Sequence, residues 1–317
     1  MRGALSLKPS YYEALRRLTL QLAGVRMGSD HAFLVETRLA NLARKEGFDS
    51  LDAMVQELFA VGQARLALQV VSALVERDTH FNRDPLSLDG LFDVALRDLA
   101  ETRGGGRIDL LSYGCGSGQD VYSVAIRARY AANKQILGAS SLHMTGVDYP
   151  SQALERAQAG RYTHFEIQRG LSARDMISHF TPDPAPGSTD WLAADHLREN
   201  IAFHDLHLMS SNDELGDFHV VMFRAPLSQY SRTASLRILR TLIKRLRPYG
   251  YLVLNSGEAI GADKLGLAEI NGMPGLYKKR DLVAEREAAE LAAQIKVPTD
   301  RKTFHDTPPP SRQARSA

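Results

Sequence analysis

The sequence has little cysteine, little net charge and no long apolar run. Its single cysteine, Cys115, excludes an internal disulfide and a cysteine-rich metal cluster. No apolar stretch reaches the roughly 20 residues that a membrane-spanning helix requires, and residues 1–18 lack the apolar core of a secretory signal. The formal net charge of +2 is too small to indicate nucleic-acid binding. No metal site is expected, because His204 and His207 are three apart on a predicted strand and so point to opposite faces. We therefore expect a cytoplasmic protein that neither inserts into a membrane nor binds nucleic acid.

The chain is long enough for one large domain or two modest ones. Its 317 residues can bury a core of normal size. The first third is patterned for helices, because apolar residues recur at i, i+3 and i+4. The segments with this spacing are 11–24, 31–47, 50–60 and 64–77. We predict a helical N-terminal domain over residues 1–77.

From Arg107 onward, short apolar segments alternate with helical patterns. Strands are predicted at 107–113, 142–149, 200–208, 218–225 and 251–257, and helices at 120–134, 151–160 and 234–246. This alternation predicts an α/β fold with a doubly wound, mostly parallel sheet. Residues 264–280 carry Asn271–Gly272 and Pro274–Gly275 between two apolar segments. That pattern predicts a hairpin that adds an antiparallel strand to the sheet.

The second predicted domain spans residues 78–285 and holds an insertion-like region at 161–199. Within this region, residues 181–191 are rich in Pro, Gly, Ser and Asp, so we expect a loop there and no clear strand pair over 181–199. Residues 286–317 begin with the end of an Ala- and Glu-rich helix and then become polar and Pro-rich. We expect this last segment to be a disordered tail.

A glycine-rich loop, Gly114-x-Gly116-x-Gly118, follows the first predicted strand and precedes a helix. In a doubly wound sheet this position binds ligands at the carboxyl ends of the strands. A dinucleotide fingerprint places its third glycine three positions after the second, whereas here the third follows after two. The shorter spacing favours S-adenosylmethionine, which has no pyrophosphate to place at the helix N-terminus. We interpret Cys115 as part of the ligand wall, since nothing indicates a histidine partner for a nucleophile.

Two charged side chains are candidates for ligand contacts. Asp148 ends the strand after the loop, where a carboxylate can accept hydrogen bonds from both ribose hydroxyls; the alternative is that it caps the helix starting near Ser151. Arg83 lies in the segment 74–85, where a guanidinium can pair with the carboxylate of a methionine moiety. The alternative for Arg83 is an ordinary surface arginine beside Asp84, and spacing alone leaves both open.

Several motifs, in the same order, resemble the CheR-type chemotaxis receptor glutamate methyltransferases, which are class I S-adenosylmethionine-dependent enzymes. Thr-x-Phe-x-Arg occurs at 79–83, Gly-Cys-x-x-Gly followed by Tyr-Ser occurs at 114–123, and Asp148 is followed by ALERAQAGRY. FLVETRLANLARKEGF (33–48) resembles the family's helical domain, and LRPYGYLVLNSGE (246–258) resembles its last core strand. The resemblance covers roughly residues 10–285 and implies a class I methyltransferase fold.

The resemblance also implies which residues contact the cofactor, S-adenosylmethionine, and its product S-adenosylhomocysteine. Arg83 would lie near the methionine end, the glycine loop would wall the methionine part, and Asp148 would hold the ribose. The positions that match the family's cofactor contacts are Arg77, Thr79, Arg83, Gly114, Cys115, Gly116, Gln119, Asp148, His207, Leu208, Ala225 and Pro226. The departures from the family's residue types are Arg77, His207 and Ala225 in place of asparagine, Gln119 and Asp120 in place of glutamate, and Gln229 in place of tyrosine.

The activity implied is S-adenosylmethionine-dependent O-methylation of glutamate side chains. The glutamate carboxylate attacks the sulfonium methyl in line and is already ionised near neutral pH, so no general base is required. Orientation supplies up to about 7–11 kcal/mol of such a barrier. Arg83 and Tyr230 are the catalytic candidates, because they can orient the cofactor or the incoming carboxylate. The departures leave two alternatives: a non-catalytic cofactor-binding regulatory relative, and a methyltransferase that acts on another substrate.

The partner implied is the cytoplasmic helical bundle of a chemoreceptor. The helical segment 31–47 carries Arg38, Arg44 and Lys45, which can dock on acidic faces of that bundle; the alternative is a solvated helix face. Family members that grip a receptor pentapeptide use a β-insertion after the second helix. Because residues 181–199 offer no clear strand pair, we expect no such tether.

Overall fold

The computed structural model describes residues 7–28, 31–75, 79–149, 151–206, 215–281, 283 and 285–287. Residues up to Arg280 form one unit, and a second begins at Asp281. Within the described ranges, no helix is long and apolar enough to cross a membrane. The predicted tail, 286–317, lies almost entirely outside the described residues, as does the predicted domain boundary at residue 77.

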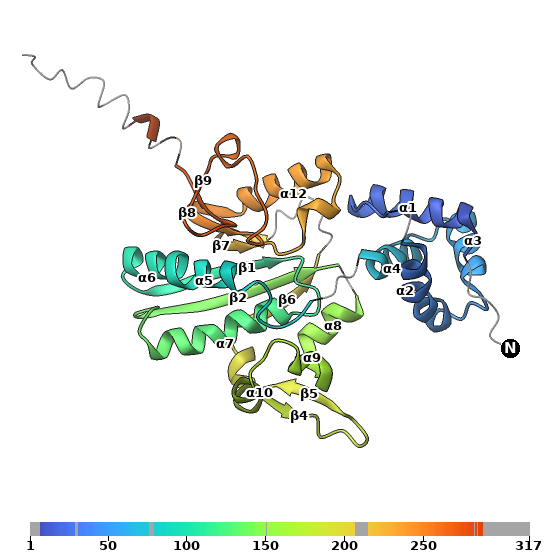
Figure 1. Cartoon of the computed structure of the whole chain (residues 1–317), viewed down its shortest axis with the longest axis horizontal. Coiled ribbons are helices and arrows are strands. Elements are labelled where there is room, and N and C mark those ends of the chain that lie inside the picture. The colour runs from blue at the N-terminus through green and yellow to red at the C-terminus, as the bar shows by residue number, and fades with distance from the viewer. Residues whose placement is uncertain are drawn as a thin grey trace, which may run out of the picture. The chain divides into compact units, whose positions relative to one another are not determined.

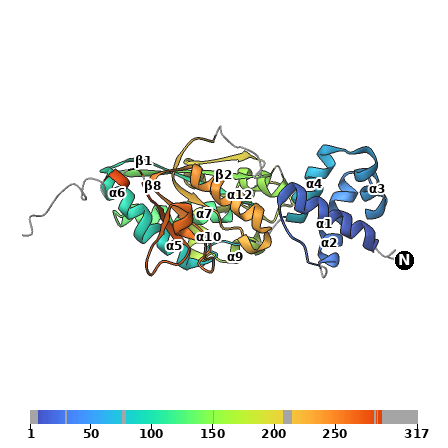
Figure 2. The same cartoon turned by 90° about the horizontal axis from the view of Figure 1, so that it is seen from above.

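The described N-terminal residues form helices where the apolar spacing predicts them. These helices are α1 (Pro9–Ala23), α2 (Ala32–Lys45), α3 (Leu51–Val61) and α4 (Ala64–Val75). Helix α1 ends at Gly24, whose φ of 70° is the left-handed conformation typical of a helix C-terminus. Ser50 begins α3 by accepting a hydrogen bond from the Ala53 N–H. The apolar faces of the four helices enclose a core of their own, and Figure 2 shows the helices grouped together.

The described residues form a seven-stranded main sheet in the order β6-β2-β1-β7-β8-β10-β9. Its strands are β1 (Gly106–Tyr113), β2 (Ser140–Asp148), β6 (Ile201–Asp205), β7 (Phe218–Met222), β8 (Leu246–Val253), β9 (Leu267–Glu269) and β10 (Leu276–Lys279). The pairs from β6 to β8 are parallel, whereas β10 is antiparallel to both β8 and β9. The predicted doubly wound, mostly parallel fold and its C-terminal hairpin are confirmed.

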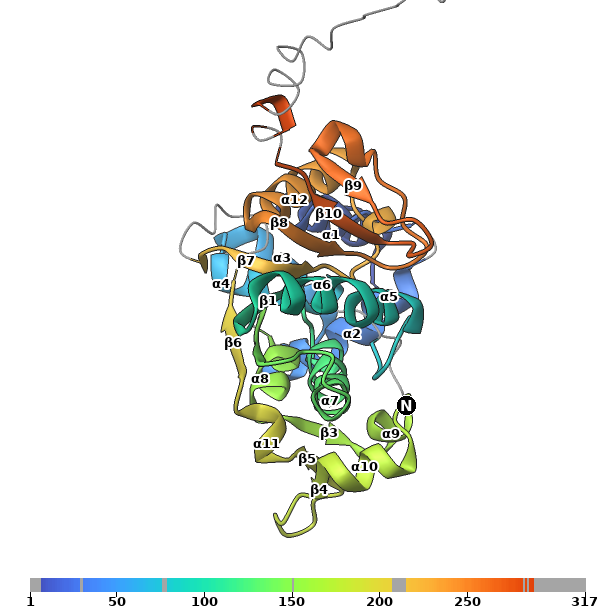
Figure 3. The ribbon, with the colours of Figure 1, turned by 90° about the vertical axis from the view of Figure 1, so that its left-hand side faces the viewer.

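Helices cover both faces of the main sheet (Figures 1 and 3). The helical elements of this region are α5 (Pro85–Gly90), the π-helix η1 (Leu91–Leu96), α6 (Arg97–Arg103), α7 (Gln119–Asn133), α8 (Gln152–Ala159), α12 (Arg232–Lys244) and the 3-10 turns η3 (Leu227–Gln229) and η4 (Ala262–Leu265). Leu110 of β1 packs in one core with Val124 of α7, whereas the next residue, Leu111, packs with Ile238 of α12. This alternation is that of a strand buried on both faces. The helical run over 85–103 is missing from the sequence prediction.

Residues 161–198 form a small α/β insertion between α8 and β6. Its elements are β3 (Arg161–Thr163), α9 (His164–Gln168), α10 (Ala173–His179), β4 (Phe180–Pro182), β5 (Asp190–Ala193) and α11 (Asp195–Arg198). The three strands form an antiparallel sheet, with β5 between β3 and β4. The prediction that 181–199 contains no strand pair is therefore wrong. With three and four residues, β4 and β5 are too short for alternation to reveal them, and the Pro- and Gly-containing residues 183–189 connect them.

Candidate active site

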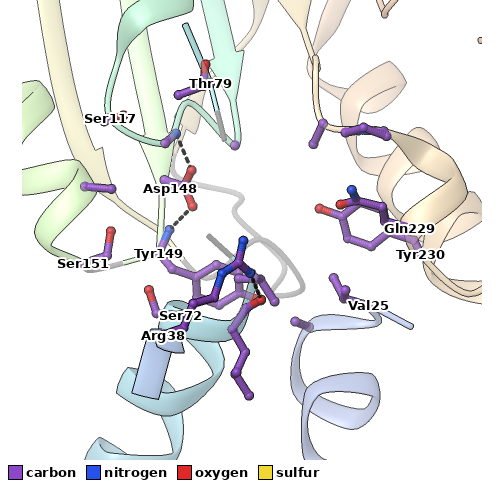
Figure 4. Close-up of a pocket in the computed structure, with 18 of the residues that line it drawn as sticks. Val25, Arg38, Ser72, Thr79, Ser117, Asp148, Tyr149, Ser151, Gln229 and Tyr230 are labelled. Atoms are coloured by element: carbon purple, nitrogen blue, oxygen red, sulfur yellow. Dashed lines mark hydrogen bonds between the residues drawn. The ribbon is translucent and has the colours of Figure 1, made fainter. Parts of the chain in front are cut away.

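A cavity of about 330 Å³ lies at the carboxyl ends of β1, β2 and β7, which is where doubly wound sheets bind ligands. Its volume falls within the roughly 300–1,000 Å³ range of small-molecule sites. Its walls include the glycine loop, the end of β2, the segment after β7 and parts of the N-terminal helices (Figure 4). The structure brings the following predicted site residues to this cavity: Thr79, Arg83, Gly114, Cys115, Gly116, Asp148, Ala225, Pro226 and Tyr230.

The glycine loop depends on left-handed backbone conformations. Gly114, Gly116 and Gly118 have φ of 72°, 57° and 83°, which side-chain-bearing residues rarely adopt. The N–H groups of Gly114 and Cys115 both donate to the carbonyl of Val147, at 2.8 and 3.1 Å, and so join the loop to the end of β2. At Gly118 there is also no room for a side chain, because an added Cβ would lie 2.9 Å from Ala157 Cβ. The loop thus holds its backbone against the cavity without interposed side chains.

Asp148 extends from the end of β2 into the cavity wall. Its Oδ2 accepts a hydrogen bond from the Gly116 N–H at 2.5 Å, and its Oδ1 accepts one from the Tyr149 N–H at 2.7 Å (Figure 4). The following helix, α8, is capped instead by Ser151, whose Oγ accepts from the Leu154 N–H at 3.2 Å. The structure therefore does not support the helix-capping alternative for Asp148, which leaves a role at the cavity.

Cys115 is a buried wall residue. Its side chain is 6% exposed. Burial raises the pKa of the Cys115 thiol well above its ordinary value, and the neighbouring Asp148 carboxylate raises it further. A thiol in this environment stays protonated at neutral pH and is a poor nucleophile, so the wall interpretation is the one that the geometry supports.

Arg83 reaches the cavity from the segment between α4 and α5. Its Nη2 donates to Asp120 Oδ2 and to the Arg224 carbonyl, both at 2.8 Å, and its Nη1 donates to Asn255 Oδ1 at 3.4 Å. Its Nε is buried and has no hydrogen-bond partner among the described residues. A buried donor without a partner costs free energy unless a ligand or water accepts from it, so this nitrogen suits an anionic group of a bound molecule.

The alternative of a surface arginine beside Asp84 does not fit the structure. The Arg83 side chain is only 22% exposed. Asp84 bonds elsewhere, because its oxygens accept from the Ser256 N–H and hydroxyl, both at 2.7 Å. Burial alone would raise the pKa of Asp84, but the hydrogen bonds from Ser256, together with the charge of Arg224, lower it below its ordinary value.

Two residues of the cavity wall are not among the predicted contacts: Asp120, which the sequence marks only as a departure from a family glutamate, and Arg224. The Asp120 carboxylate lies in the cavity wall, between the guanidinium of Arg83 and that of Arg224, whose Nε is 3.4 Å from Asp120 Oδ1. Arg224 is 3% exposed and donates to Ser87 Oγ at 2.5 Å and to the Arg83 carbonyl. Burial lowers the pKa of Arg224, whereas Asp120 raises it. The available signal for Asp120 was its place in the first turn of the helix after the glycine loop.

Gln119 is not among the described residues that line this cavity. Its side chain is 1% exposed, and its Oε1 accepts a hydrogen bond from Ser117 Oγ at 2.6 Å. Successive helix residues point in directions about 100° apart, so Gln119 turns inward under the loop while Asp120 faces the cavity.

The segment after β7 forms the opposite wall. Ala225, Pro226, Gln229 and Tyr230 line the cavity there, and Figure 4 shows Gln229 and Tyr230 side by side. This wall is joined to the residues after α1: Val25 and Tyr230 form an antiparallel bridge. The N-terminal helices therefore help to complete the site.

The basic residues of α2 have different surroundings. Arg38 is half-buried and lines the cavity, with its Nη1 donating to the carbonyl of Leu74 at 2.6 Å (Figure 4). Arg44 and Lys45 are exposed at the end of α2. A second cavity of about 840 Å³ lies between α2, α4 and α8 and includes Lys45. The lining residues common to both cavities are Arg38, Ser72 and Ser151.

Three predicted cofactor contacts lie outside the described residues: Arg77, His207 and Leu208. The described groups suit a ligand that combines an anion, a cation and hydroxyls. Arg83 offers a donor to an anion, Asp120 can attract a cation, and Asp148 can accept from hydroxyls. S-adenosylmethionine carries a carboxylate, an ammonium group and a ribose, so the residues present fit it.

Comparison with known proteins agrees with this assignment. A family model described as "CheR methyltransferase, SAM binding domain" matches residues 77–273. Chemotaxis protein methyltransferase 1 of Pseudomonas aeruginosa is 30% identical over 251 residues, which are 78% of this chain and 90% of that protein. Chemotaxis protein methyltransferase Cher2 of Pseudomonas putida is 28% identical over 269 residues, which are 84% of this chain and 93% of that protein.

Proposed function

The chain belongs to the CheR methyltransferases and carries their S-adenosylmethionine-binding domain, and we propose that it methylates glutamate side chains of a chemoreceptor. When bound, S-adenosylmethionine supplies an electrophilic methyl group on a sulfonium sulfur. The observation that supports the cofactor is the placement of Arg83, Asp120 and Asp148 around one cavity, because these three side chains match its carboxylate, ammonium group and ribose. The receptor substrate is proposed from the relatives named chemotaxis protein methyltransferases.

Different residues along the cavity would bind different groups of the cofactor. Asp148 accepts hydrogen bonds from the ribose hydroxyls, and the unpartnered Nε–H of Arg83 donates to the carboxylate. Asp120 attracts the ammonium group while it remains paired with Arg83. Cys115, Ala225 and the loop glycines provide walls without charge.

Methylation of a carboxylate makes few demands on acid–base groups. A glutamate side chain is ionised near neutral pH, so the enzyme has to orient it and need not remove a proton. Tyr230 and Gln229 line the wall opposite the glycine loop, and we assign to Tyr230 the positioning of the incoming carboxylate. Orientation of this kind supplies up to about 7–11 kcal/mol.

The second cavity supports a receptor approach beside α2. Arg38, Ser72 and Ser151 line both cavities, so the second cavity lies next to the first and offers a receptor segment a place beside the cofactor. Lys45 lines this approach, Arg44 is exposed beside it, and Arg38 stands at the junction. Their positive charges complement an acidic helical surface and accelerate encounter with it.

The absence of a receptor-tail tether stays a prediction. The sequence argument for it, that residues 181–199 contain no strand pair, no longer holds because β4 and β5 pair. Methylation of a receptor that lacks its C-terminal tail tests the point. Unchanged methylation would support the prediction, and full loss of methylation would contradict it.

Two measurements in sequence test the function. Calorimetry with S-adenosylhomocysteine asks whether the chain binds the product, and absence of binding at millimolar ligand would refute the proposal. Radiolabelled methyl transfer to receptor-containing membranes, followed by alkaline release of the label, then asks whether a carboxyl ester forms. A receptor whose candidate glutamates are changed to glutamine is the matched control, since it should accept no label.

A non-catalytic relative is the second candidate function. The observation in its favour is Ala225, whose side chain offers no hydrogen-bonding atom at a position where the family has asparagine. Binding of S-adenosylhomocysteine without any methyl ester formation would support this candidate.

A further inference from the structure

We propose that Tyr162, in the inserted three-stranded sheet, is a positioning residue for cofactor binding, because it holds the glycine loop and the Arg83 segment at once. Tyr162 lies on β3 and is fully buried. Its hydroxyl donates to the carbonyl of Ser117 at 2.7 Å. Ser117 itself lines the cofactor cavity, so this bond joins the insertion to the cavity wall.

The Ser117 bond requires a close approach between the insertion and the loop. At Gly118, an added Cβ would lie 3.1 Å from the Tyr162 hydroxyl. The peptide that joins Ser117 to Gly118 is therefore held on its carbonyl side by Tyr162, within a run of left-handed glycines. Conformations of this kind persist when the surroundings over-determine them, and the Tyr162 bond is one such constraint.

The Tyr162 ring also contacts the segment that carries Arg83. It packs edge-on against Phe81 with ring centroids 5.0 Å apart, and Phe180 of β4 packs on Phe81 at 5.5 Å. Phe81 is fully buried and lies two residues before Arg83. The aromatic cluster of the insertion therefore anchors the segment that carries the guanidinium.

A second contact between the insertion and this segment involves Asn82. Asn82 adopts φ of 50°, and its Nδ2 donates to the carbonyl of Gly170 at 2.9 Å. Gly170 follows α9 and is in close contact with Phe81, since an added Cβ there would lie 1.9 Å from the Phe81 oxygen. The residue before Arg83 is thus held in a left-handed conformation by a backbone carbonyl of the insertion.

Tyr122 provides a matched control for Tyr162. It is also fully buried, and its hydroxyl also donates to a backbone carbonyl, that of Ala157 at 3.0 Å. The two rings pack against each other at 5.8 Å. Ala157 belongs to α8 and does not line the cofactor cavity among the described residues. Removal of either hydroxyl costs one buried hydrogen bond, but only Tyr162→Phe removes a bond to a residue that lines the cofactor cavity, Ser117.

The test compares Tyr162→Phe and Tyr122→Phe in the full chain, by calorimetry with S-adenosylhomocysteine and by thermal unfolding. We expect similar decreases in Tm and a rise in Kd of about three- to tenfold for Tyr162→Phe alone, since one hydrogen bond contributes about 0.5–1.5 kcal/mol and a tenfold change corresponds to about 1.4 kcal/mol. Equal Kd values for both variants and the wild type, or an equal rise in both variants, would overturn the proposal.

Asn82→Gly keeps the test decisive if Tyr162→Phe does not fold. Glycine tolerates the left-handed backbone, so this change removes the bond to Gly170 without adding strain. We expect a rise in Kd here too, and an unchanged Kd would count against the proposal. The readout contains no receptor, so it does not depend on which carboxylate is methylated. A wild-type chain that fails to bind S-adenosylhomocysteine would contradict the proposed function instead.

Discussion

Replacement of Arg83 with alanine separates cofactor binding from folding. The change removes two hydrogen bonds of 2.8 Å, to Asp120 and to the Arg224 carbonyl, together with the buried Nε that has no partner among the described residues. Asp120 keeps a cationic neighbour, because Arg224 Nε lies 3.4 Å from its other oxygen. We therefore expect Arg83→Ala to fold, to bind cofactor weakly and to lose methyl transfer.

The expected magnitudes follow from the contacts of Arg83. One hydrogen bond from a charged donor to the cofactor carboxylate contributes about 1.5–3 kcal/mol, so its loss raises Kd by about 10- to 150-fold. Loss of the internal bonds lowers the free energy of unfolding by about 1–3 kcal/mol, since Asp120 stays paired. A stability of about 5–15 kcal/mol tolerates that decrease.

The assay for Arg83 combines calorimetry with S-adenosylhomocysteine, thermal unfolding and radiolabelled methyl transfer. Arg83→Lys is the matched control, because lysine keeps a positive charge beside Asp120 but lacks the planar guanidinium fork; we expect an intermediate Kd. An alanine variant with wild-type Kd and wild-type transfer would refute the role assigned to Arg83. An unfolded alanine variant would refute the claim that Arg224 suffices for Asp120.

Three further predictions address other parts of the molecule. Asp148→Asn should raise the Kd for S-adenosylhomocysteine by about tenfold, because an amide is a weaker acceptor than a carboxylate; calorimetry checks this, and an unchanged Kd would exclude the ribose role. Lys45→Ala should raise the KM for receptor several-fold, most strongly at low salt, and leave the cofactor Kd unchanged; Arg240→Ala, an exposed arginine of α12, is the control, and equal effects in both would contradict a specific receptor approach. Burial, with Arg103 and Arg247, lowers the pKa of His219 from 6.5 to about 4, so the unfolded chain binds more protons between these values and the free energy of unfolding falls as pH drops from 6.5 to 4. His219→Gln keeps a polar group near the Asp109 N–H, which now donates to His219 Nδ1 at 3.0 Å, and should flatten that dependence in denaturant titrations.

Elements with a clear apolar spacing or a turn signal could be predicted from the sequence, whereas the helical run over 85–103 and the strands of the insertion could not. The four N-terminal helices and the parallel strands of the main sheet follow from apolar spacing, and β9 and β10 follow from the turn residues between them. The insertion-like region is predicted, but its strands are missed because β3, β4 and β5 are only three or four residues long. A strand of three residues contains too little alternation to distinguish it from a loop.

The candidate site divides in the same way. The positions of Gly114, Gly116 and Asp148 beside the cavity could be predicted from the sequence, because a loop between a strand and a helix has a known place in a doubly wound sheet. The choice between Gln119 and Asp120 depended on which way each side chain points from the first turn of α7, and that direction is settled by packing around Ser117.

The sequence by itself determined the fold class, the family and the glycine loop, because these depend on local conformation and on the order of motifs along the chain. Only the tertiary structure decided which charges meet. Arg83 and Arg224 are far apart in the chain, yet each accepts from the other at its backbone carbonyl, with Asp120 between them. Contacts of this kind form only when segments that are distant in the sequence pack together, so the spacing of residues within one segment cannot predict them.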